Sequence, residues 1–487
     1  MGTIFEDDSL GLHTDLYQIN MAFTYWQDGI HENKAVFDLF FRKLPFGNGY
    51  GIFAGLERVI EYLQGFSFTT SDIQFLRETL NYPEDFLAYL SELRFTGTVN
   101  CMEEGELVFG NVPILRVEAS LAEAQLIETA LLNIVNYQTL IATKAARIKE
   151  VVGDEVAMEY GSRRAQELDA AIWGTRAAFI GGFQATSNVR AGKKFGIPVA
   201  GTHAHALVQA YGDEYKAFHK YAESHTDCVF LVDTYNTLRS GVPNAIKVAK
   251  ELGDKIRFKG IRLDSGDLAY LSKEARKMLD DAGFTDTKII ASNDLDEYTI
   301  MNLKAQGAKI DIWGIGTKLI TGYDQPALGA VYKLVSIERD GEMTDTIKIS
   351  ANPEKVSTPG LKKVYRIINK ANDKSEGDYI ALDYEDPQQE ERLKMFHPVH
   401  TYISKFVTNF EAKELHVQVF SNGELTYQKP EIDKIQQKVK ANLSLLWDEY
   451  RRALNPEEYP VDLSPACWEN KMNHIATIKE KVKQNEK

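Results

Sequence analysis

The sequence contains little cysteine and no long apolar run. Only three of its 487 residues are cysteines, and Cys101, Cys228 and Cys467 lie far apart without a Cys-x-x-Cys pair. They suggest neither a disulfide framework nor a zinc knuckle, and a reducing cytosol is the simplest environment for them. No apolar run approaches the roughly 20 residues that a membrane-spanning helix needs. The amino terminus, MGTIFEDD, lacks the basic and apolar regions of a secretory signal, so we expect a cytoplasmic protein.

Excess positive charge and the common nucleotide fingerprints are missing as well. The formal net charge of -14 argues against a general nucleic-acid binder, although a local basic pocket can still bind phosphates. Neither a Walker motif nor a strand-helix GxGxxG pattern is present, which excludes a standard P-loop or Rossmann site. The composition is that of a globular protein with two or three domains. We expect small-molecule partners, and neither nucleic acid nor a membrane.

The middle of the chain has the rhythm of a parallel α/β sheet. Six short apolar runs, each ending in polar residues, lie at 156–164, 197–205, 229–237, 258–267, 288–296 and 310–317. Helix-like stretches such as 245–252 and 273–282 separate them, as in repeated βα units. Six strands are fewer than the eight of a closed barrel, so we predict an irregular or incomplete α/β barrel over 151–335. Its active site belongs at the carboxyl ends of the strands.

Residues 1–150 have the pattern of a mixed α+β domain. The sequence predicts a helix over 14–28 capped by Thr14, and strands over 35–41, 96–102 and 113–119. It also predicts a helix from about Gly55, and a long helix over 120–152 that begins with a capping box of Ser120 and Glu123.

Beyond the barrel, the pattern changes to antiparallel strands and polar helices. A hairpin is predicted around Asp340 and Gly341. Residues 336–395 form a β-rich segment that we expect to pack back on the amino-terminal domain. Residues 396–487 form a carboxyl-terminal extension that is predicted to be largely helical, with helices over 432–454 and 466–484.

The segment GTHAH contains two histidines, His203 and His205, which share one side if the strand continues through them. Three interpretations are open: a divalent-metal pair, histidines that only bond to backbone, and a single reactive histidine. A metal pair needs further histidine ligands at later strand ends, and the chain supplies none there. A single nucleophilic or acid-base histidine is therefore favoured.

Charged residues follow three of the other runs. Arg163, in YGSRR, is either surface charge or a clamp for a carboxylate or phosphate. Arg262, Asp264 and Asp267, in GIRLDSGD, can hold an anion and a polyhydroxyl ligand, or can form a salt-bridged turn that caps the next helix. Asp233, in VDTYNT, allows the same two readings.

The last two runs end in segments suited to phosphate. Asn293, in SNDLD, precedes a predicted helix whose free amides favour an anion. Gly314 and Gly316, in GIGTK, permit close approach of the backbone to a ligand beside Thr317. Late strands of barrels often supply such a site. Together the residues suit a phosphorylated sugar that reacts through a cationic transition state at its anomeric carbon.

These motifs resemble the nicotinate phosphoribosyltransferase family. The resemblance covers roughly the first three quarters of the chain. The segments that carry it are LHTDLYQINMAFTYW (12–26), FRKLPFGNGYGIFAGLERVIEYL (41–63), YGSRRAQELDAA (160–171), GGFQATSNVRAGKKFGIPVAGTHAHALV (181–208), GIRLDSGDL (260–268) and GIGTKLITGYDQPALGAVYKL (314–334).

The resemblance implies a reaction and an architecture. The family forms nicotinate mononucleotide and pyrophosphate from nicotinate and phosphoribosyl pyrophosphate, coupled to ATP hydrolysis, in NAD salvage. Its members look like type II phosphoribosyltransferases, with a mixed amino-terminal domain and an irregular barrel. They are commonly homodimers with sites at the interface. Mg²⁺ and ATP are the implied cofactor and co-substrate, and no metal ligand is assigned.

By motif, the resemblance also assigns roles around the base. His205 matches the histidine that ATP phosphorylates transiently, and Thr202 lies beside the pyridine ring. Tyr17 stacks on nicotinate, reaching from the partner subunit. Arg262 pairs with the nicotinate carboxylate. The nicotinamide-using relatives have an Asp at the position of Ser187, so Ser187 favours nicotinic acid.

The remaining matched residues belong to the ribose and phosphates. Asp264 and Asp233 face the ribose or the Mg-bound pyrophosphate. Gly316 and Thr317 hold the 5'-phosphate, and Asn293 lies on the same phosphate side. Arg163 and Mg²⁺ balance the roughly two negative charges that a phosphohistidine adds.

Two alternatives remain open at the level of sequence. One is a metal-dependent barrel hydrolase that uses the His-x-His pair of His203 and His205. The other is a non-catalytic relative that binds nicotinate or phosphoribosyl pyrophosphate without turnover.

Overall fold

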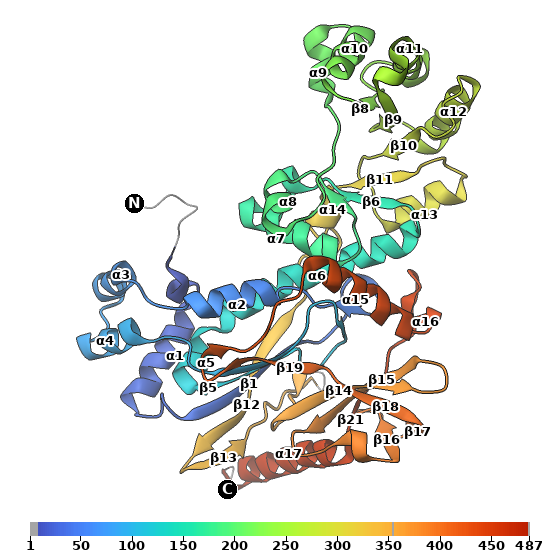
Figure 1. The fold of residues 1–487 in the computed structure, drawn as a ribbon. Helices are drawn as coiled ribbons and strands as arrows, with labels where there is room; N and C mark the ends of the chain where they lie inside the picture. Colours follow the sequence, from blue (N-terminus) through green and yellow to red (C-terminus); the bar gives the residue numbers. More distant parts are fainter. Residues whose placement is uncertain (1–7, 353–354, 486–487) are drawn as a thin grey trace. The chain divides into compact units, whose positions relative to one another are not determined.

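The computed structural model describes residues 8–352 and 355–485 and divides the chain into two compact units. Unit 2 is the continuous segment Ile141–Pro326, and unit 1 combines residues 1–140 with 327–487. Figure 1 shows both in sequence colours, with unit 2 running from teal to yellow. The sequence analysis set the limits of the barrel domain at 151 and 335. No described helix is both long enough and apolar enough to cross a membrane.

Unit 2 is built on one open parallel sheet of six strands, in the order β7-β6-β11-β10-β9-β8. The strands are β6 (Val156–Glu159), β7 (Ala185–Thr186), β8 (Asp227–Leu231), β9 (Arg257–Leu263), β10 (Lys288–Ala291) and β11 (Ile312–Ile315). Every neighbouring pair is parallel. Among the described residues, the edge strands β7 and β8 do not pair with each other. The predicted α/β fold with an incomplete barrel is confirmed.

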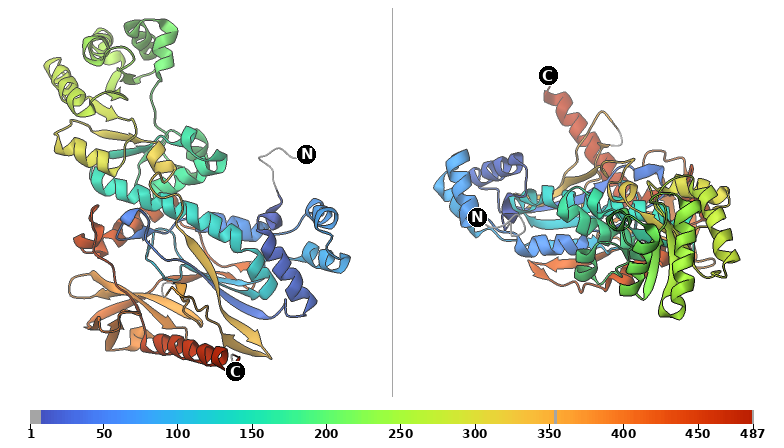
Figure 2. Two further views of the ribbon diagram at one scale, coloured as in Figure 1. Left: turned by 180° about the vertical axis from the view of Figure 1, so that it is seen from behind. Right: turned by 90° about the horizontal axis from the view of Figure 1, so that it is seen from above.

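Helices follow the strands of unit 2 in regular alternation. They are α7 (Glu167–Ile180), α8 (Val189–Phe195), α9 (His205–Tyr211), α10 (Glu214–Ser224), α11 (Val242–Leu252), α12 (Leu268–Asp281), α13 (Glu297–Ala305) and α14 (Thr317–Ile320). Contacts run in succession from α10 to α13, which Figure 2 shows as a row of green to yellow helices. In α11 the buried residues recur at helical spacing, so one apolar face of the helix packs inward.

The predicted strand over 197–205 is wrong. Within it, only Val199 makes a bridge, to Thr186 of β7. Thr186 donates to the Pro198 carbonyl at 3.0 Å and accepts from Ala200 at 2.9 Å, and the ladder then stops. Pro198 has no N–H with which to extend the pairing. The sixth strand is instead the two-residue β7, in the segment GGFQATSN.

The main sheet of unit 1 is made from both ends of the chain. Its seven strands have the order β13-β12-β1-β5-β3-β19-β20. They are β1 (Lys34–Phe41), β3 (Thr98–Met102), β5 (Leu115–Ser120), β12 (Ala330–Arg339), β13 (Glu342–Asp345), β19 (His416–Ser421) and β20 (Glu424–Leu425). β1 pairs with β12, and β3 pairs with β19, both antiparallel. The hairpin predicted around Asp340 and Gly341 joins β12 to β13.

A second sheet of unit 1 has the order β18-β14-β15-β21, and two strand pairs accompany it. Its strands are β14 (Lys362–Asn369), β15 (Lys374–Leu382), β18 (Phe410–Glu414) and β21 (Val461–Leu463). The pairs are β16 (Arg392–Phe396) with β17 (Ser404–Thr408), and β2 (Gly51–Ile52) with β4 (Leu107–Val108). The expectation of a largely helical extension after 396 therefore misses five strands, β17 to β21.

The helices of unit 1 are α1 (Leu16–Gln27), α2 (Leu56–Gly65), α3 (Thr70–Leu80), α4 (Glu84–Glu92), α5 (Leu121–Leu126), α15 (Ile432–Leu445), α16 (Asp448–Arg451) and α17 (Pro465–Asn485). The helix α6 (Glu128–Val152) begins in unit 1 and ends in unit 2. Helix α17 contacts β15.

Two predicted helices differ from the structure in their caps or their continuity. Asp15, not Thr14, caps α1 through a capping box with Gln18. The helix predicted over 120–152 is broken at Ile127 into α5 and α6. Glu123 forms no capping box, because its carboxylate instead accepts from the backbone N–H groups of Thr96 at 2.6 Å and Gly97 at 3.0 Å.

Candidate active site

The carboxyl ends of the parallel strands in unit 2 bring several predicted site residues together. Arg262 lies near the end of β9, and Asp264 directly follows that strand. Asp233 follows β8, and Ser292 follows β10. Because neighbouring parallel strands end at the same edge of the sheet, these side chains meet although they are about 30 residues apart in the chain.

Arg262 is held in place by three hydrogen bonds. Its Nε donates to Ser292 Oγ at 2.9 Å, Nη1 to Thr202 Oγ1 at 3.2 Å and Nη2 to Asp264 Oδ1 at 2.9 Å. The guanidinium also lies over the Tyr160 ring, 5.5 Å from its centroid. A guanidinium carries five N–H groups, so two remain for a ligand. Since the side chain is 13% exposed, this is a pre-oriented and partly desolvated anion site.

Asp264 and Asp267 have different roles. Asp264 Oδ1 accepts from Arg262 and from the Ser292 hydroxyl, and its side chain remains 28% exposed. Asp267 caps α12 and accepts from Tyr270 N at 3.0 Å. The helix-capping interpretation therefore holds for Asp267, while Asp264 belongs to the site.

Asp233 is a buried carboxylate with one free oxygen. Its Oδ2 accepts from Asp264 N at 2.8 Å and from Ser265 Oγ at 2.7 Å. Its side chain is 1% exposed, yet Oδ1 has no hydrogen-bond partner among the described residues. Buried polar atoms are rarely left unpaired without a ligand or an ion to meet them. Oδ1 of Asp233 is therefore a candidate ligand atom.

His205 stands beside both carboxylates, at the first residue of α9. Its Nε2 lies 3.8 Å from Asp264 Oδ2 and 4.0 Å from Asp233 Oδ1. Its Nδ1 lies 3.1 Å from Thr234 Oγ1. With 37% of its side chain exposed, the ring is open to a ligand on the site side.

His203 is buried and points elsewhere. Its Nε2 accepts from the backbone N–H of Leu231 at 3.1 Å, and its ring packs on Phe218 and Tyr221. Burial lowers its pKa, which keeps the ring neutral. The shared side expected for His203 and His205 is wrong because this segment is not a strand. The metal-pair hydrolase is excluded as well, since the lone pair of His203 is already used.

Three more predicted residues are Thr202, Ser187 and Tyr17. Thr202 accepts from Arg262 and donates to the His203 carbonyl at 2.9 Å. Ser187 directly follows β7 with an exposed side chain, and its N–H donates to the Glu159 carbonyl at 3.0 Å. Tyr17 belongs to unit 1, on α1, where its side chain is 48% exposed and its hydroxyl accepts from Gln18 Nε2 at 3.2 Å.

Arg163 lies in a short 3-10 helix, Ser162–Arg164, directly after β6. Its side chain is exposed and has no ion-pair partner among the described residues. It is free to meet a phosphate.

One backbone amide in the first turn of α13 is already used within the chain. Asp296 caps this helix, accepting from Thr299 N at 2.7 Å, and its other oxygen accepts from Lys318 Nζ at 2.6 Å. Burial acts to raise the pKa of Asp296, but the bonds from Lys318 and Thr299 outweigh it and lower the pKa. Asn293 lies exposed in the preceding loop with a φ of 104°. The role of Asn293 beside a phosphate stays a prediction, with Thr299 N no longer available to the ligand.

The two glycines of GIGTK serve different needs. A Cβ on Gly314 would lie 2.7 Å from the Tyr160 ring, so this glycine permits the packing of an aromatic side chain. Gly316 caps α14, and Thr317 is the first residue of that helix. Gly316 and Thr317 stay predicted contacts for a phosphate.

Glu159 is a functional residue that the sequence reasoning missed. Its buried carboxylate accepts from Gly161 N, from Thr175 Oγ1 at 3.0 Å and from Thr186 Oγ1 at 2.6 Å. Burial raises its pKa, although these three bonds oppose the shift. It ties the loop before Arg163 to β7, which precedes Ser187. The available signal was an acidic residue within the apolar run VAME.

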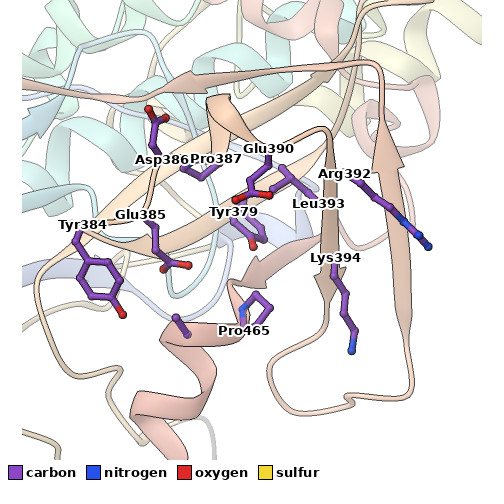
Figure 3. A pocket seen from close by; sticks show the side chains of 11 residues that line it. Tyr379, Tyr384, Glu385, Asp386, Pro387, Glu390, Arg392, Leu393, Lys394 and Pro465 are labelled. Atoms are coloured by element: carbon purple, nitrogen blue, oxygen red, sulfur yellow. The ribbon is translucent and has the colours of Figure 1, made fainter.

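A hollow of about 530 Å³ lies in unit 1, lined by Tyr379, Tyr384, Glu385, Asp386, Pro387, Glu390, Arg392, Leu393, Lys394, Pro465 and Ala466 (Figure 3). Two of its charged side chains, Glu385 and Arg392, make contacts with other residues of unit 1. Glu385 accepts from Leu382 N at 2.7 Å and from Ser464 Oγ at 2.6 Å. Arg392 stacks on the Phe406 ring at 3.6 Å. None of the predicted site residues lines it.

Comparisons with known proteins show which family the chain is similar to. A family model described as the nicotinate phosphoribosyltransferase (NAPRTase) family matches residues 156–388. Models of the NAPRTase amino-terminal and carboxyl-terminal domains match residues 12–136 and 361–471. The chain is 73% identical to nicotinate phosphoribosyltransferase of Bacillus subtilis (strain 168), over 99% of this chain and 98% of that protein.

More distant relatives share the full length. Nicotinate phosphoribosyltransferase of Homo sapiens is 33% identical, over 93% of this chain and 94% of that protein. The crystal structure of human nicotinic acid phosphoribosyltransferase superposes with a TM-score of 0.84 at 30% identity, covering 94% of this chain and 99% of that one. The chain therefore belongs to the nicotinate phosphoribosyltransferase family.

Proposed function

We propose that the site around Arg262, Asp264 and His205 carries out the reaction of this family, the transfer of a phosphoribosyl group to nicotinate in NAD salvage. Nicotinate and phosphoribosyl pyrophosphate give nicotinate mononucleotide and pyrophosphate. The observation that carries the assignment is the Arg262 guanidinium, held by three hydrogen bonds with two N–H groups to spare. A planar carboxylate matches that fork.

The chemistry needs stabilisation of positive charge. The bond from the ribose anomeric carbon to pyrophosphate breaks, its electron pair leaves with pyrophosphate, and the pyridine nitrogen forms the new bond to carbon. The ribose is cationic between these events, and the carboxylates of Asp264 and Asp233 supply negative charge at the edge of the sheet. Arg262 orients the nicotinate carboxylate, so that the ring nitrogen faces the ribose, and Thr202 lies beside the ring.

Mg²⁺ fits the oxygen atoms that the site offers. Asp233 Oδ1 is buried and makes no hydrogen bond to a described residue, although His205 Nε2 lies 4.0 Å away, and Asp264 Oδ2 makes no such bond either. Hard divalent cations prefer such carboxylate oxygens, together with substrate phosphates. Bound there, Mg²⁺ neutralises charge on the leaving pyrophosphate.

ATP acts through His205. The 37% exposure of this side chain leaves the ring accessible to a phosphoryl donor. A phosphate on the ring adds close to two negative charges, which Arg163 and Mg²⁺ balance. Without these cations the phosphohistidine would repel pyrophosphate.

The other predicted residues define the ends of the ligand. Ser187, which carries no charge, tolerates the carboxylate of nicotinate, where an aspartate would repel it. Gly316 and Thr317 contact the 5'-phosphate, and Asn293 supports this side from its loop. Tyr17 stacks on the base from the partner subunit of a homodimer.

A cytoplasmic location completes the proposal. The cysteines Cys101, Cys228 and Cys467 are buried free thiols. Burial raises the pKa of Cys228 to about 11 and of Cys467 to about 12, which keeps both protonated. Such thiols suit a reducing compartment.

The test is direct synthesis of the mononucleotide by the full chain. The protein is incubated with nicotinate, phosphoribosyl pyrophosphate and Mg²⁺, with and without ATP, and the nucleotide and pyrophosphate are quantified by chromatography. Product in equal amounts with pyrophosphate, stimulated by ATP, is expected. Binding of both substrates without product would favour the non-catalytic alternative and overturn the assignment.

A further inference from the structure

The two ring nitrogens of His205 have different surroundings. On one side, Nε2 faces the carboxylates of Asp264 and Asp233 at 3.8 and 4.0 Å. On the other side, Nδ1 lies 3.1 Å from the hydroxyl of Thr234. Thr234 is the residue after Asp233. The loop that follows β8 therefore supplies a neighbour to each ring nitrogen, Asp233 to Nε2 and Thr234 to Nδ1.

The contact with Thr234 distinguishes the two tautomers of the neutral ring. A neutral imidazole has one N–H and one lone pair. When the Thr234 hydroxyl donates to Nδ1, that nitrogen carries the lone pair and the proton lies on Nε2.

We propose that Thr234 is a positioning residue for phosphoryl transfer, whose hydroxyl holds His205 in the tautomer that leaves Nδ1 as the nucleophile. This rests on the proposed phosphorylation of His205. Thr234 need not touch ATP to act in this way, since it fixes the ring orientation and the nitrogen that carries the lone pair.

Transfer of the phosphoryl group from ATP to His205 needs no proton acceptor. Nδ1 attacks the γ-phosphorus of ATP, the N–P bond forms, and the P–O bond to ADP breaks with its electron pair leaving on ADP. Nε2 keeps its proton throughout. The ring becomes positively charged and faces Asp233 and Asp264, which stabilise that charge. The Thr234 hydroxyl loses the bond to Nδ1 and turns to donate to an oxygen of the new phosphoryl group.

The first experiment measures phosphorylation of the full chain from ATP by rapid quench. In Thr234→Val the hydroxyl is lost at nearly constant volume, and in Thr234→Ser it is kept. The loss of one hydrogen bond that orients the nucleophile predicts a rate of phosphohistidine formation about tenfold lower in Thr234→Val. Thr234→Ser should stay within about twofold of the unmodified chain, since the donor remains.

The matched control is Thr477→Val in α17, which removes a hydroxyl that donates to the Asn473 carbonyl at 2.9 Å in unit 1. This variant should phosphorylate at the unmodified rate. Equal impairment of Thr234→Val and Thr234→Ser would assign the effect to packing and would overturn the proposal, as would an unmodified rate in Thr234→Val.

The second experiment reads the tautomer itself. Nitrogen NMR of protein with ¹⁵N-labelled histidine, with His205→Asn used to assign the signal, should show His205 protonated at Nε2. Thr234→Val should shift the signal toward a mixture of tautomers. An unchanged tautomer would overturn the role of Thr234. If the unmodified chain takes no phosphate from ATP, the phosphohistidine proposal fails on its own, while the tautomer measurement still tests the contact.

Discussion

At Arg262, a charged side chain is fixed before any substrate binds. Thr202, Asp264 and Ser292 each occupy one of its N–H groups, and the Tyr160 ring lies under its plane. Arginine is suited to this position because its donors have a fixed planar geometry, whereas a lysine has one flexible ammonium group. The anion site is therefore defined by the orientation of a planar group as much as by its charge.

Replacing Arg262 by lysine should weaken nicotinate binding while keeping one positive charge. We expect KM for nicotinate to rise about 10- to 100-fold, or about 1.4 to 2.8 kcal/mol, because the paired donors are lost. Steady-state kinetics with varied nicotinate measure this effect. Arg257→Lys is the matched control, since Arg257 lies on the same strand in an exposed pair with Asp227. A KM that is unchanged in Arg262→Lys would exclude the carboxylate contact.

Removing the imidazole of His205 should uncouple ATP from product formation. In His205→Asn, we expect ATP to lose its stimulation of mononucleotide synthesis while the thermal unfolding temperature stays close to that of the unmodified chain. The comparison is His219→Asn, because His219 is an exposed residue of α10 that pairs with Glu223. ATP coupling retained in His205→Asn would contradict the phosphohistidine.

At the scale of the elements, Glu159 joins parts of the fold that carry the site. One buried carboxylate accepts from a loop amide after β6, from a hydroxyl in α7 and from a hydroxyl in β7. These elements precede Arg163 and Ser187, and their relative position depends on this group.

Glu159→Gln should destabilise unit 2 and disturb both neighbours. The amide nitrogen would face donors, so at least one buried bond is lost, and we expect a decrease of about 1–3 kcal/mol in the free energy of unfolding. Urea denaturation followed by circular dichroism gives this value. Glu223→Gln, at an exposed position of α10, should change stability little. Equal stability of the two variants would remove Glu159 from this role.

The sequence predicted elements better than it predicted side-chain contacts. Strands such as β1 and β9 were found because apolar runs and turn residues mark them. The segment 197–205 was misread because its apolar residues continue past Pro198, where the ladder ends. Strand β7 consists of only two residues, and an alternating apolar and polar pattern cannot be recognised over such a short length.

The meeting of side chains at the sheet edge was predictable where a motif lies at a strand end, as for Arg262 and Asp264. Their mutual contacts were not predictable, because Ser292 and Thr202 reach Arg262 from other parts of the chain. The cap of α13 was not predictable either, because the Asp296 side chain takes the Thr299 amide that the sequence left free for a ligand.

At the scale of the whole molecule, the proposed homodimer makes a prediction about shared sites. Tyr17 is on α1 of unit 1, half-exposed, while His205 is in unit 2. If Tyr17 completes the site of the partner, co-expressed Tyr17→Ala and His205→Asn chains should regain activity. Random pairing gives about a quarter of the sites in intact form.

The measurement is mononucleotide synthesis by the mixed preparation and by each variant alone. Activity that does not exceed the sum of the separate variants would mean that Tyr17 acts within its own chain or not at all. Sedimentation of the unmodified chain reports the oligomeric state independently.

The antiparallel pairing of β1 with β12 and of β3 with β19 determines an order of events during synthesis. Unit 2 is one uninterrupted segment, so all of its strands have been translated by residue 326. The strands β1, β3 and β5 emerge earlier but must wait, with unpaired edges, for partners that are translated after residue 330. Exposed strand edges are templates for aggregation, and distant pairings form slowly. The nascent amino-terminal third is therefore the part of this chain that most needs protection by chaperones.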